Sequence, residues 1–103
     1  MITPTVGRVV WFYPGDDDNL RVSLAGHAGE PLAAIVTFVW ANRLVNLAVF
    51  DADGNPWGRV SMPLRQEGDP KPKGSHCEWM RPQKGQAAKT EAAEAKTREF
   101  MGR

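Results

Sequence analysis

Two runs of alternating hydrophobic residues occupy the middle of the chain. The first, Leu32 to Trp40, is rich in β-branched and aromatic residues, which favours a strand. The second, Arg43 to Phe50, alternates between two faces, Val45, Leu47 and Val49 on one and Leu44, Asn46, Ala48 and Phe50 on the other. Ala41-Asn42 separates the runs, and asparagine tolerates the positive φ of a tight turn. The pattern predicts a β-hairpin at the centre of the fold.

Three further strands are predicted around this hairpin. Gly7 to Tyr13 is largely apolar at both sets of alternating positions, which predicts a strand covered on both sides. Trp57 to Met62 follows the turn-forming residues Asp51 to Pro56 and is expected to end at Pro63. The last and shortest strand is His76 to Met80. The three central strands are expected to form an antiparallel meander.

Two long connections join these strands. The loop from Pro14 to Pro31 has about seventeen residues, which exceeds the usual connection. Within it, Leu20 to Leu24 is predicted to add a short edge strand. Gln66 to Gly74 holds prolines and glycines among charged residues, which predicts an exposed linker.

Five short strands with large loops predict a mainly β fold, and closure into a small barrel would remove the open edges of such a sheet. We expect a five-stranded SH3-like barrel, with an OB-like barrel as the alternative, over residues 1–80. The composition then changes. Residues 81–103 form a basic, Ala-rich tail in which Gln86 to Phe100 contains strong helix formers and neither glycine nor proline. A C-terminal α-helix is predicted there.

Charge is distributed unevenly between these two parts. The formal net charge of the 103 residues is +1, but residues 1–70 have five Arg against eight Asp and Glu, whereas residues 71–103 have eight Lys and Arg against four Glu. A basic tail suits an anionic partner or a solubilising role. No stretch has the length of a membrane span and no secretory signal is visible, and a lone cysteine, Cys77, fits a reducing cytoplasm.

Candidate metal sites fail on ligand number and spacing. His76, Cys77 and Glu78 are adjacent, with His27 elsewhere, but a structural zinc ion needs four N or S ligands. The motif Asp51-x-Asp53-x-Asn55 begins like a calcium-binding loop, yet proline and methionine, Pro56 and Met62, stand where that loop requires glycine and glutamate. A turn explains the same residues.

Catalytic patterns are also missing from the sequence. Cys77 and His76 are neighbours on a predicted strand, so their side chains should point to opposite faces. The glycines form neither a phosphate-binding loop nor a dinucleotide fingerprint. We therefore expect no catalytic residue, no metal ion and no cofactor, and a protein that is not an enzyme.

The four tryptophans provide the candidate binding residues. About two of them are expected in the core of so small a domain. Trp40 and Trp57, at strand ends beside Arg43 and Arg59, are the surface candidates, because Arg and Trp are enriched at recognition sites. With the basic residues of the tail, the candidate binding set is Trp40, Arg43, Trp57, Arg59, Lys84, Lys89, Lys96 and Arg98.

Four segments of the sequence stand out together: the opening Pro4-Thr5-Val6-Gly7-Arg8-Val9-Val10-Trp11-Phe12-Tyr13, the central Leu32-Ala33-Ala34-Ile35-Val36-Thr37, Val45-Asn46-Leu47-Ala48-Val49-Phe50, and Cys77-Glu78-Trp79-Met80. In these segments the chain resembles a widespread family of small uncharacterised proteins of tailed bacteriophages. The resemblance covers about three quarters of the chain, and it brings no assigned catalytic or binding residue.

The resemblance implies an accessory binding module that engages a host protein or sequesters a small-molecule ligand in the cytoplasm of the infected bacterium. Two alternatives stay open: a virion structural or assembly protein whose helical tail docks on a neighbouring subunit, and a nucleic-acid-binding protein that uses the basic tail. A host or phage protein is the expected partner, a homo-oligomer is left open, and no membrane partner is expected.

Overall fold

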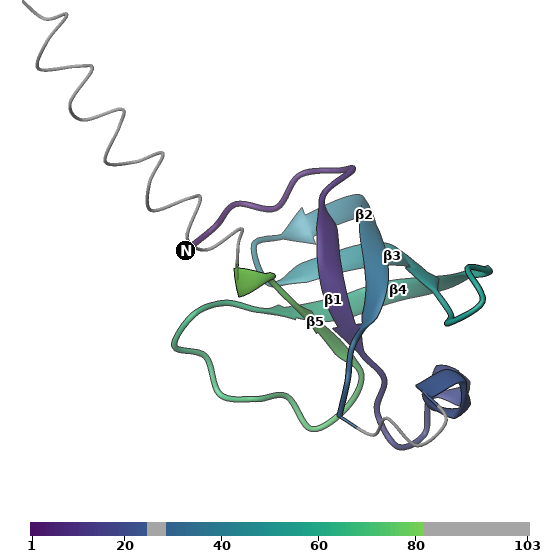
Figure 1. The fold of residues 1–103 in the computed structure, drawn as a ribbon. Coiled ribbons are helices and arrows are strands. Elements are labelled where there is room, and N and C mark those ends of the chain that lie inside the picture. Colours follow the sequence, from purple (N-terminus) through teal and green to yellow (C-terminus); the bar gives the residue numbers. More distant parts are fainter. Residues whose placement is uncertain (25–28, 82–103) are drawn as a thin grey trace, which may run out of the picture.

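The computed structural model describes residues 1–24 and 29–81. These stretches form five strands and one 3-10 helix, in the order β1 (Val9–Tyr13), η1 (Asn19–Leu24), β2 (Leu32–Ala41), β3 (Leu44–Phe50), β4 (Pro56–Arg65) and β5 (His76–Glu78) (Figure 1). The predicted C-terminal helix falls on residues 82–103, outside the described residues. Within the described stretches, no helix has the length and apolar character needed to cross a bilayer.

The strands close into a barrel. β1, β2 and β3 each pair antiparallel with the strand that follows, while β5 pairs antiparallel with β1 and parallel with β4. Glu78 of β5 completes the closure, because it lies opposite Trp11 of β1 on one side and Arg65 of β4 on the other. The prediction of a mainly β, five-stranded barrel is confirmed, and so is the central meander.

Alternate side chains of the strands fill the barrel. The three β3 residues predicted to share a face, Val45, Leu47 and Val49, are all buried. The other buried hydrophobic residues are Val10, Phe12, Leu20, Leu32, Ala34, Val36, Leu64, Cys77 and Trp79. Removing this apolar surface from water is the main force that holds so small a barrel together.

The first strand is half exposed, which corrects the prediction of cover on both sides. Val10 and Phe12 point inward and are fully buried, whereas Val9 is on the outer face and exposed. A closed barrel has only one interior, so an apolar outward residue stays at the surface unless a loop covers it. Trp11 and Tyr13 are half-buried on that outer side.

The segment predicted as an edge strand is the 3-10 helix η1. Asp18, just before it, accepts a hydrogen bond from the backbone N–H of Leu20 at 2.9 Å, and its own N–H donates to the carbonyl of Gly15 at 3.0 Å. An acidic residue that caps the first backbone N–H groups favours a helical turn over an extended strand.

Pro63 does not end β4, contrary to prediction. The strand continues to Arg65, and the N–H of Leu64 donates to the carbonyl of Arg43 at 3.0 Å. Pairing with β5 begins only at Leu64, so the missing N–H of Pro63 interrupts no hydrogen bond between these strands.

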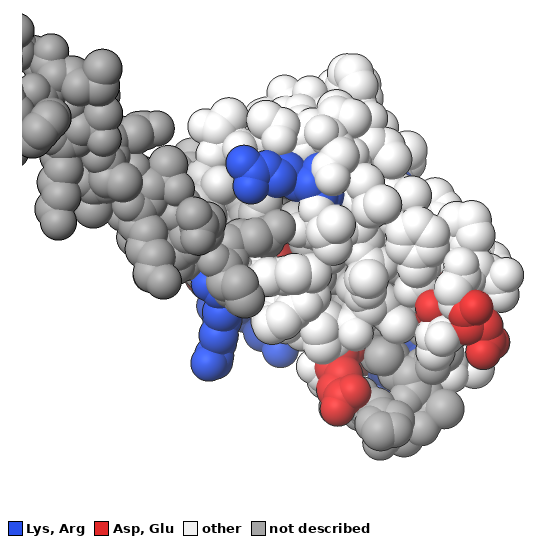
Figure 2. Space-filling model, turned by 45° about the horizontal axis from the view of Figure 1, so that its top comes forward, with Lys and Arg blue, Asp and Glu red and all other residues white. Residues whose placement is uncertain are grey.

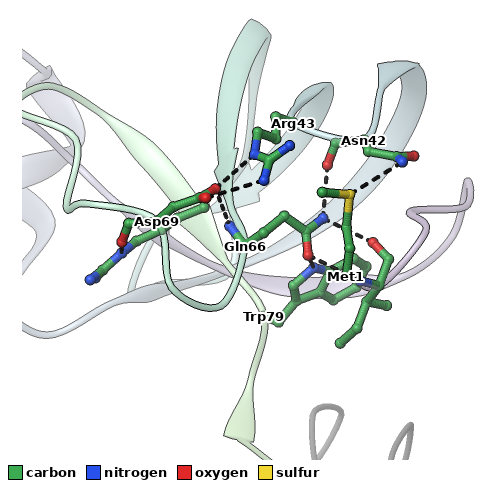
Figure 3. Close-up of polar contacts among 8 residues, drawn as sticks. Met1, Asn42, Arg43, Gln66, Asp69 and Trp79 are labelled. Atoms are coloured by element: carbon green, nitrogen blue, oxygen red, sulfur yellow. Dashed lines mark hydrogen bonds and ion pairs between the residues drawn. The ribbon is translucent and has the colours of Figure 1, made fainter.

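Gln66 corrects the expectation of an exposed linker after β4. Its side chain is buried, and its Nε2 donates to the carbonyls of Ile2 and Asn42 at 2.9 and 2.8 Å (Figure 3). Its Oε1 accepts from the N–H of Ile2 and from the indole of Trp79, both at 3.1 Å (Figure 3). One amide thus joins the N-terminal segment, the β2–β3 turn and the residue after β5.

Candidate functional site

The outer face of the β2–β3–β4 meander carries several exposed apolar side chains. Trp40 is 59% exposed, Phe38 48% and Val60 69%, and Leu44 and Pro63 lie beside them. The register places Phe38 opposite Asn46, and Leu44 opposite Pro63. These five apolar residues form what we call the outer patch: Phe38, Trp40, Leu44, Val60 and Pro63.

Two aromatic rings of the patch are held in fixed positions. The ring of Phe38 meets that of Trp40 edge to face, with centroids 4.7 Å apart and an interplanar angle of 68°. The indole Nε1 of Trp40 donates to Oδ1 of Asn46 at 2.9 Å. Because both contacts orient the indole, little side-chain freedom is left to lose when a partner binds.

Asn46 is itself fixed by an irregularity in β4. Its Oδ1 also accepts a hydrogen bond from the backbone N–H of Ser61 at 2.8 Å. Ser61 has a φ of 53°, in the left-handed region that non-glycine residues rarely adopt, and the β3–β4 register shifts between Val45 and Leu47. The side chain of Asn46 therefore replaces a backbone partner at the bulge and connects it to the exposed tryptophan.

The strands that form this face contribute no charge to it, and Arg43, in the turn before Leu44, is exposed but paired with Asp69. β2 and β3, residues 32–41 and 44–50, contain no Asp, Glu, Lys or Arg. The two arginines of β4, Arg59 and Arg65, bind Asp18 and Glu78 outside the patch. On the side of the molecule that Figure 2 shows, residues other than Lys, Arg, Asp and Glu cover a broad area, and the basic and acidic groups lie apart from one another. The uncharged strand residues of the meander suit an apolar partner better than a phosphate.

The structure separates the four barrel residues of the predicted binding set. Trp40 belongs to the outer patch, whereas Trp57 lies opposite Val49, toward the other end of β3. The indole of Trp57 donates to Oδ2 of Asp51 at 3.0 Å, and this hydrogen bond is the main cause of the lowered pKa of Asp51. Both tryptophans are exposed, as predicted, but they do not share a surface.

The two arginines of that set are held by carboxylates. Arg43 binds Asp69 through Nε at 2.9 Å, a contact that lowers the pKa of Asp69. Arg59 binds Asp18 through two nitrogens, at 2.8 and 3.1 Å. The remaining members, Lys84, Lys89, Lys96 and Arg98, lie outside the described residues.

Sequence reasoning missed Phe38, Asn46 and Val60. The sequence contains one hint, a single polar residue, Asn46, at an outward position of an otherwise apolar strand. The register shift of β2 between Val36 and Phe38, which leaves Phe38 outward, has no comparable mark in the sequence.

Cys77 lacks the environment of a nucleophile. It is fully buried, and desolvation raises the pKa of its thiol to about 12. His76 is also buried, but its ring nitrogens face the carbonyl of Gly74 at 3.1 Å and Oε2 of Glu78 at 2.9 Å. Burial therefore disfavours the thiolate at neutral pH, and the thiolate is the form in which cysteine acts as a nucleophile.

His76 belongs to a polar cluster on the outside of the closing strands. Its ring stacks on that of Tyr13, with centroids 5.3 Å apart, and Arg65 binds the same Glu78 oxygen at 3.3 Å. Burial acts to raise the pKa of Glu78, but the hydrogen bonds from His76 and Arg65 prevail and lower it. The pKa of Tyr13 is raised, chiefly by burial and then by Glu78.

A cleft of about 490 Å³ opens beside this cluster, between the loop after β1 and the loop before β5. Tyr13 and His76 line it together with Lys71, Lys73 and the exposed ion pair of Arg21 with Asp16. Its charges are of both signs, so they favour no single class of ligand. Within residues 1–24 and 29–81, no three acidic, His or Cys side chains are grouped as metal ligands.

Comparisons with protein-family models, with curated proteins and with solved structures find no match. The fold defines the protein as a small closed β-barrel protein, and the outer patch is its candidate functional surface.

Proposed function

We propose that the chain is a non-enzymatic protein-binding module built on an SH3-like barrel, and that the outer patch is its contact surface. One observation carries the proposal: Trp40 is 59% exposed and yet fixed by Asn46 and Phe38. Tryptophan is the residue type most enriched at interface hot spots, and a fixed ring binds with a small loss of entropy. The meander closed by β1 and β5 supports the SH3-like assignment.

A protein partner is favoured over nucleic acid by the chemistry of the patch. The electrostatic affinity for nucleic acid comes from Lys and Arg beside the phosphates, and β2 and β3 contribute neither on residues 32–41 and 44–50. The resemblance of the sequence to bacteriophage proteins supports a role as an accessory protein that binds its partner in an infected bacterium.

Capture from a lysate of a host bacterium tests the proposal with a matched pair of variants. Val60→Glu puts a charge into the outer patch, whereas Val22→Glu puts the same charge on η1, where Val22 is 81% exposed. Both positions are at the surface, so both variants should fold. We expect Val60→Glu to lose the protein that the wild type retains and Val22→Glu to keep it. Equal retention by both variants would show that the patch is not the contact surface.

A further inference from the structure

We propose that one partner of the outer patch is a second copy of this chain, packed face to face about a two-fold axis and competing with other proteins for the patch. The inference rests on the proposed function, because it names a partner of the same surface. Three properties of the face fit it to a second copy: its charge, its relief and its area.

A two-fold interface places one surface patch against itself, so the patch must tolerate its own charge distribution. A charged residue near the axis would face the same charge on the other copy, and like charges repel. The outward positions of β2 and β3, residues 32–41 and 44–50, carry no charge, and Asn46 is bonded to Trp40 and Ser61. Arg43, in the turn between these strands, is exposed but paired with Asp69. The face therefore meets its own copy with little repulsion between like charges.

The same face also contains raised and low regions next to each other. The outer patch is the raised region, with Val60 at one flank. Two positions before Val60 lies Gly58, which is paired with Ala48, and both occupy outward positions. A Cβ built on Gly58 would meet nothing within 4 Å, so the surface there is open. A two-fold axis between the two regions sets the patch of each copy over the Ala48–Gly58 pair of the other.

The exposed area fits a reversible dimer. A buried aromatic side chain covers about 150–250 Å², so Phe38 and Trp40, at 48% and 59% exposed, together offer roughly 200 Å². With Leu44, Val60 and Pro63 the patch reaches the size of the largest apolar patches on monomers. Two such faces match the small interfaces of transient complexes, so dimers should dissociate on dilution.

Gly58 allows a test that leaves the fold intact. Its φ lies outside the left-handed region and its outward side is open, so Gly58→Thr adds a strand-favouring side chain without a clash. In the dimer this side chain would occupy the space needed by the other copy. Gly74 is a matched control, because a Cβ there also meets nothing within 4 Å, and Gly74 lies in the loop before β5, off the meander.

Sedimentation velocity of the full-length chain over about a hundredfold range of concentration provides the measurement. We expect the wild type and Gly74→Thr to shift from monomer to dimer as concentration rises, and Gly58→Thr to stay monomeric with an unchanged unfolding midpoint. A wild type that stays monomeric throughout would overturn the inference, and so would a Gly58→Thr variant that dimerises as well as the wild type.

Lysate capture then separates the two proposals. If the wild type is monomeric but Val60→Glu still loses a captured protein that Val22→Glu keeps, the second copy is wrong and the binding function stands. If the wild type is monomeric and both variants capture equally, both proposals are wrong.

Discussion

Arg59 of β4 and Asp18 of the long loop after β1 form a two-point ion pair, from Nε to Oδ2 at 3.1 Å and from Nη2 to Oδ1 at 2.8 Å. The same carboxylate accepts the hydroxyl of Ser75 at 3.0 Å and the backbone N–H of Leu20. One largely buried carboxylate therefore joins the long loop, β4 and the segment before β5. Arg59, predicted as a binding residue, serves here to hold these segments together.

Arg59→Lys should destabilise the barrel by about 1–2 kcal/mol, because a lysine keeps the charge but cannot form the paired hydrogen bonds of a guanidinium. Urea unfolding followed by tryptophan fluorescence measures the change. Arg8→Lys is the control, since Arg8 is exposed and its Nε donates to the hydroxyl of Thr5 at 3.3 Å, with no carboxylate in that contact. A free energy of unfolding that falls equally in both variants would contradict the structural role of the pair.

Acid should destabilise the fold through Asp18. The pKa of Asp18 lies below its ordinary value of 3.8, and the hydrogen bonds from Arg59 are the main cause. A carboxyl whose pKa is lower in the folded state adds stability above its unfolded pKa, and this is lost as pH falls through the folded value. Unfolding free energies measured from pH 7 down to about pH 2 should fall most steeply below the unfolded pKa. Asp18→Asn should be less stable at pH 7 and show a shallower decline, and an unchanged decline would contradict the assignment.

Gln66→Glu should destabilise the barrel by about 3 kcal/mol, because it replaces a buried donor by an acceptor that faces the carbonyls of Ile2 and Asn42. Asn42→Asp makes the same chemical change at the neighbouring exposed turn and should alter stability by less than about 0.5 kcal/mol. Thermal unfolding compares the two. Similar losses in both variants would show that Gln66 is not the junction that its four contacts describe.

Ser61→Gly should be more stable than Ser61→Ala by about 1 kcal/mol, because only glycine adopts a left-handed backbone without steric cost. In an ordinary strand the order is reversed, since glycine is the weaker residue there. The sign of the difference, measured by urea unfolding, therefore reports the φ of 53° at this bulge. An alanine variant that is the more stable of the two would rule out the strained bulge.

The strands could be predicted because the alternation of apolar and polar residues that marks a strand is visible in a short stretch of sequence. Alternation in residues 44–50 fixes which side chains enter the barrel, and that assignment is confirmed. The prediction that Pro63 ends β4 was wrong because a proline interrupts a strand only where a neighbouring strand needs its N–H. That depends on where β5 begins to pair, which is set by the tertiary structure. η1 was missed for a similar reason, since its first turn depends on the cap provided by Asp18.

The candidate site was harder to predict than the fold. The exposure of Trp40 and Trp57 followed from their places at strand ends, but their separation depends on the register of β4 against β3. The partners of Arg43 and Arg59 lie 26 and 41 residues away along the chain. Gln66 stands among prolines, glycines and charges, where nothing in the local pattern predicts that an amide will be buried.

Closure by β5 has a consequence for the order in which the chain can fold during its synthesis. The meander β2–β4 needs only neighbouring segments and can pair as soon as residue 65 has been made. β1 and β4 gain their last partner only when His76–Glu78 emerges. Until then a nascent chain exposes two unpaired strand edges, the features through which β proteins most readily aggregate. The three residues of β5 thus determine when the growing polypeptide covers its strand edges and is protected from aggregation with other copies.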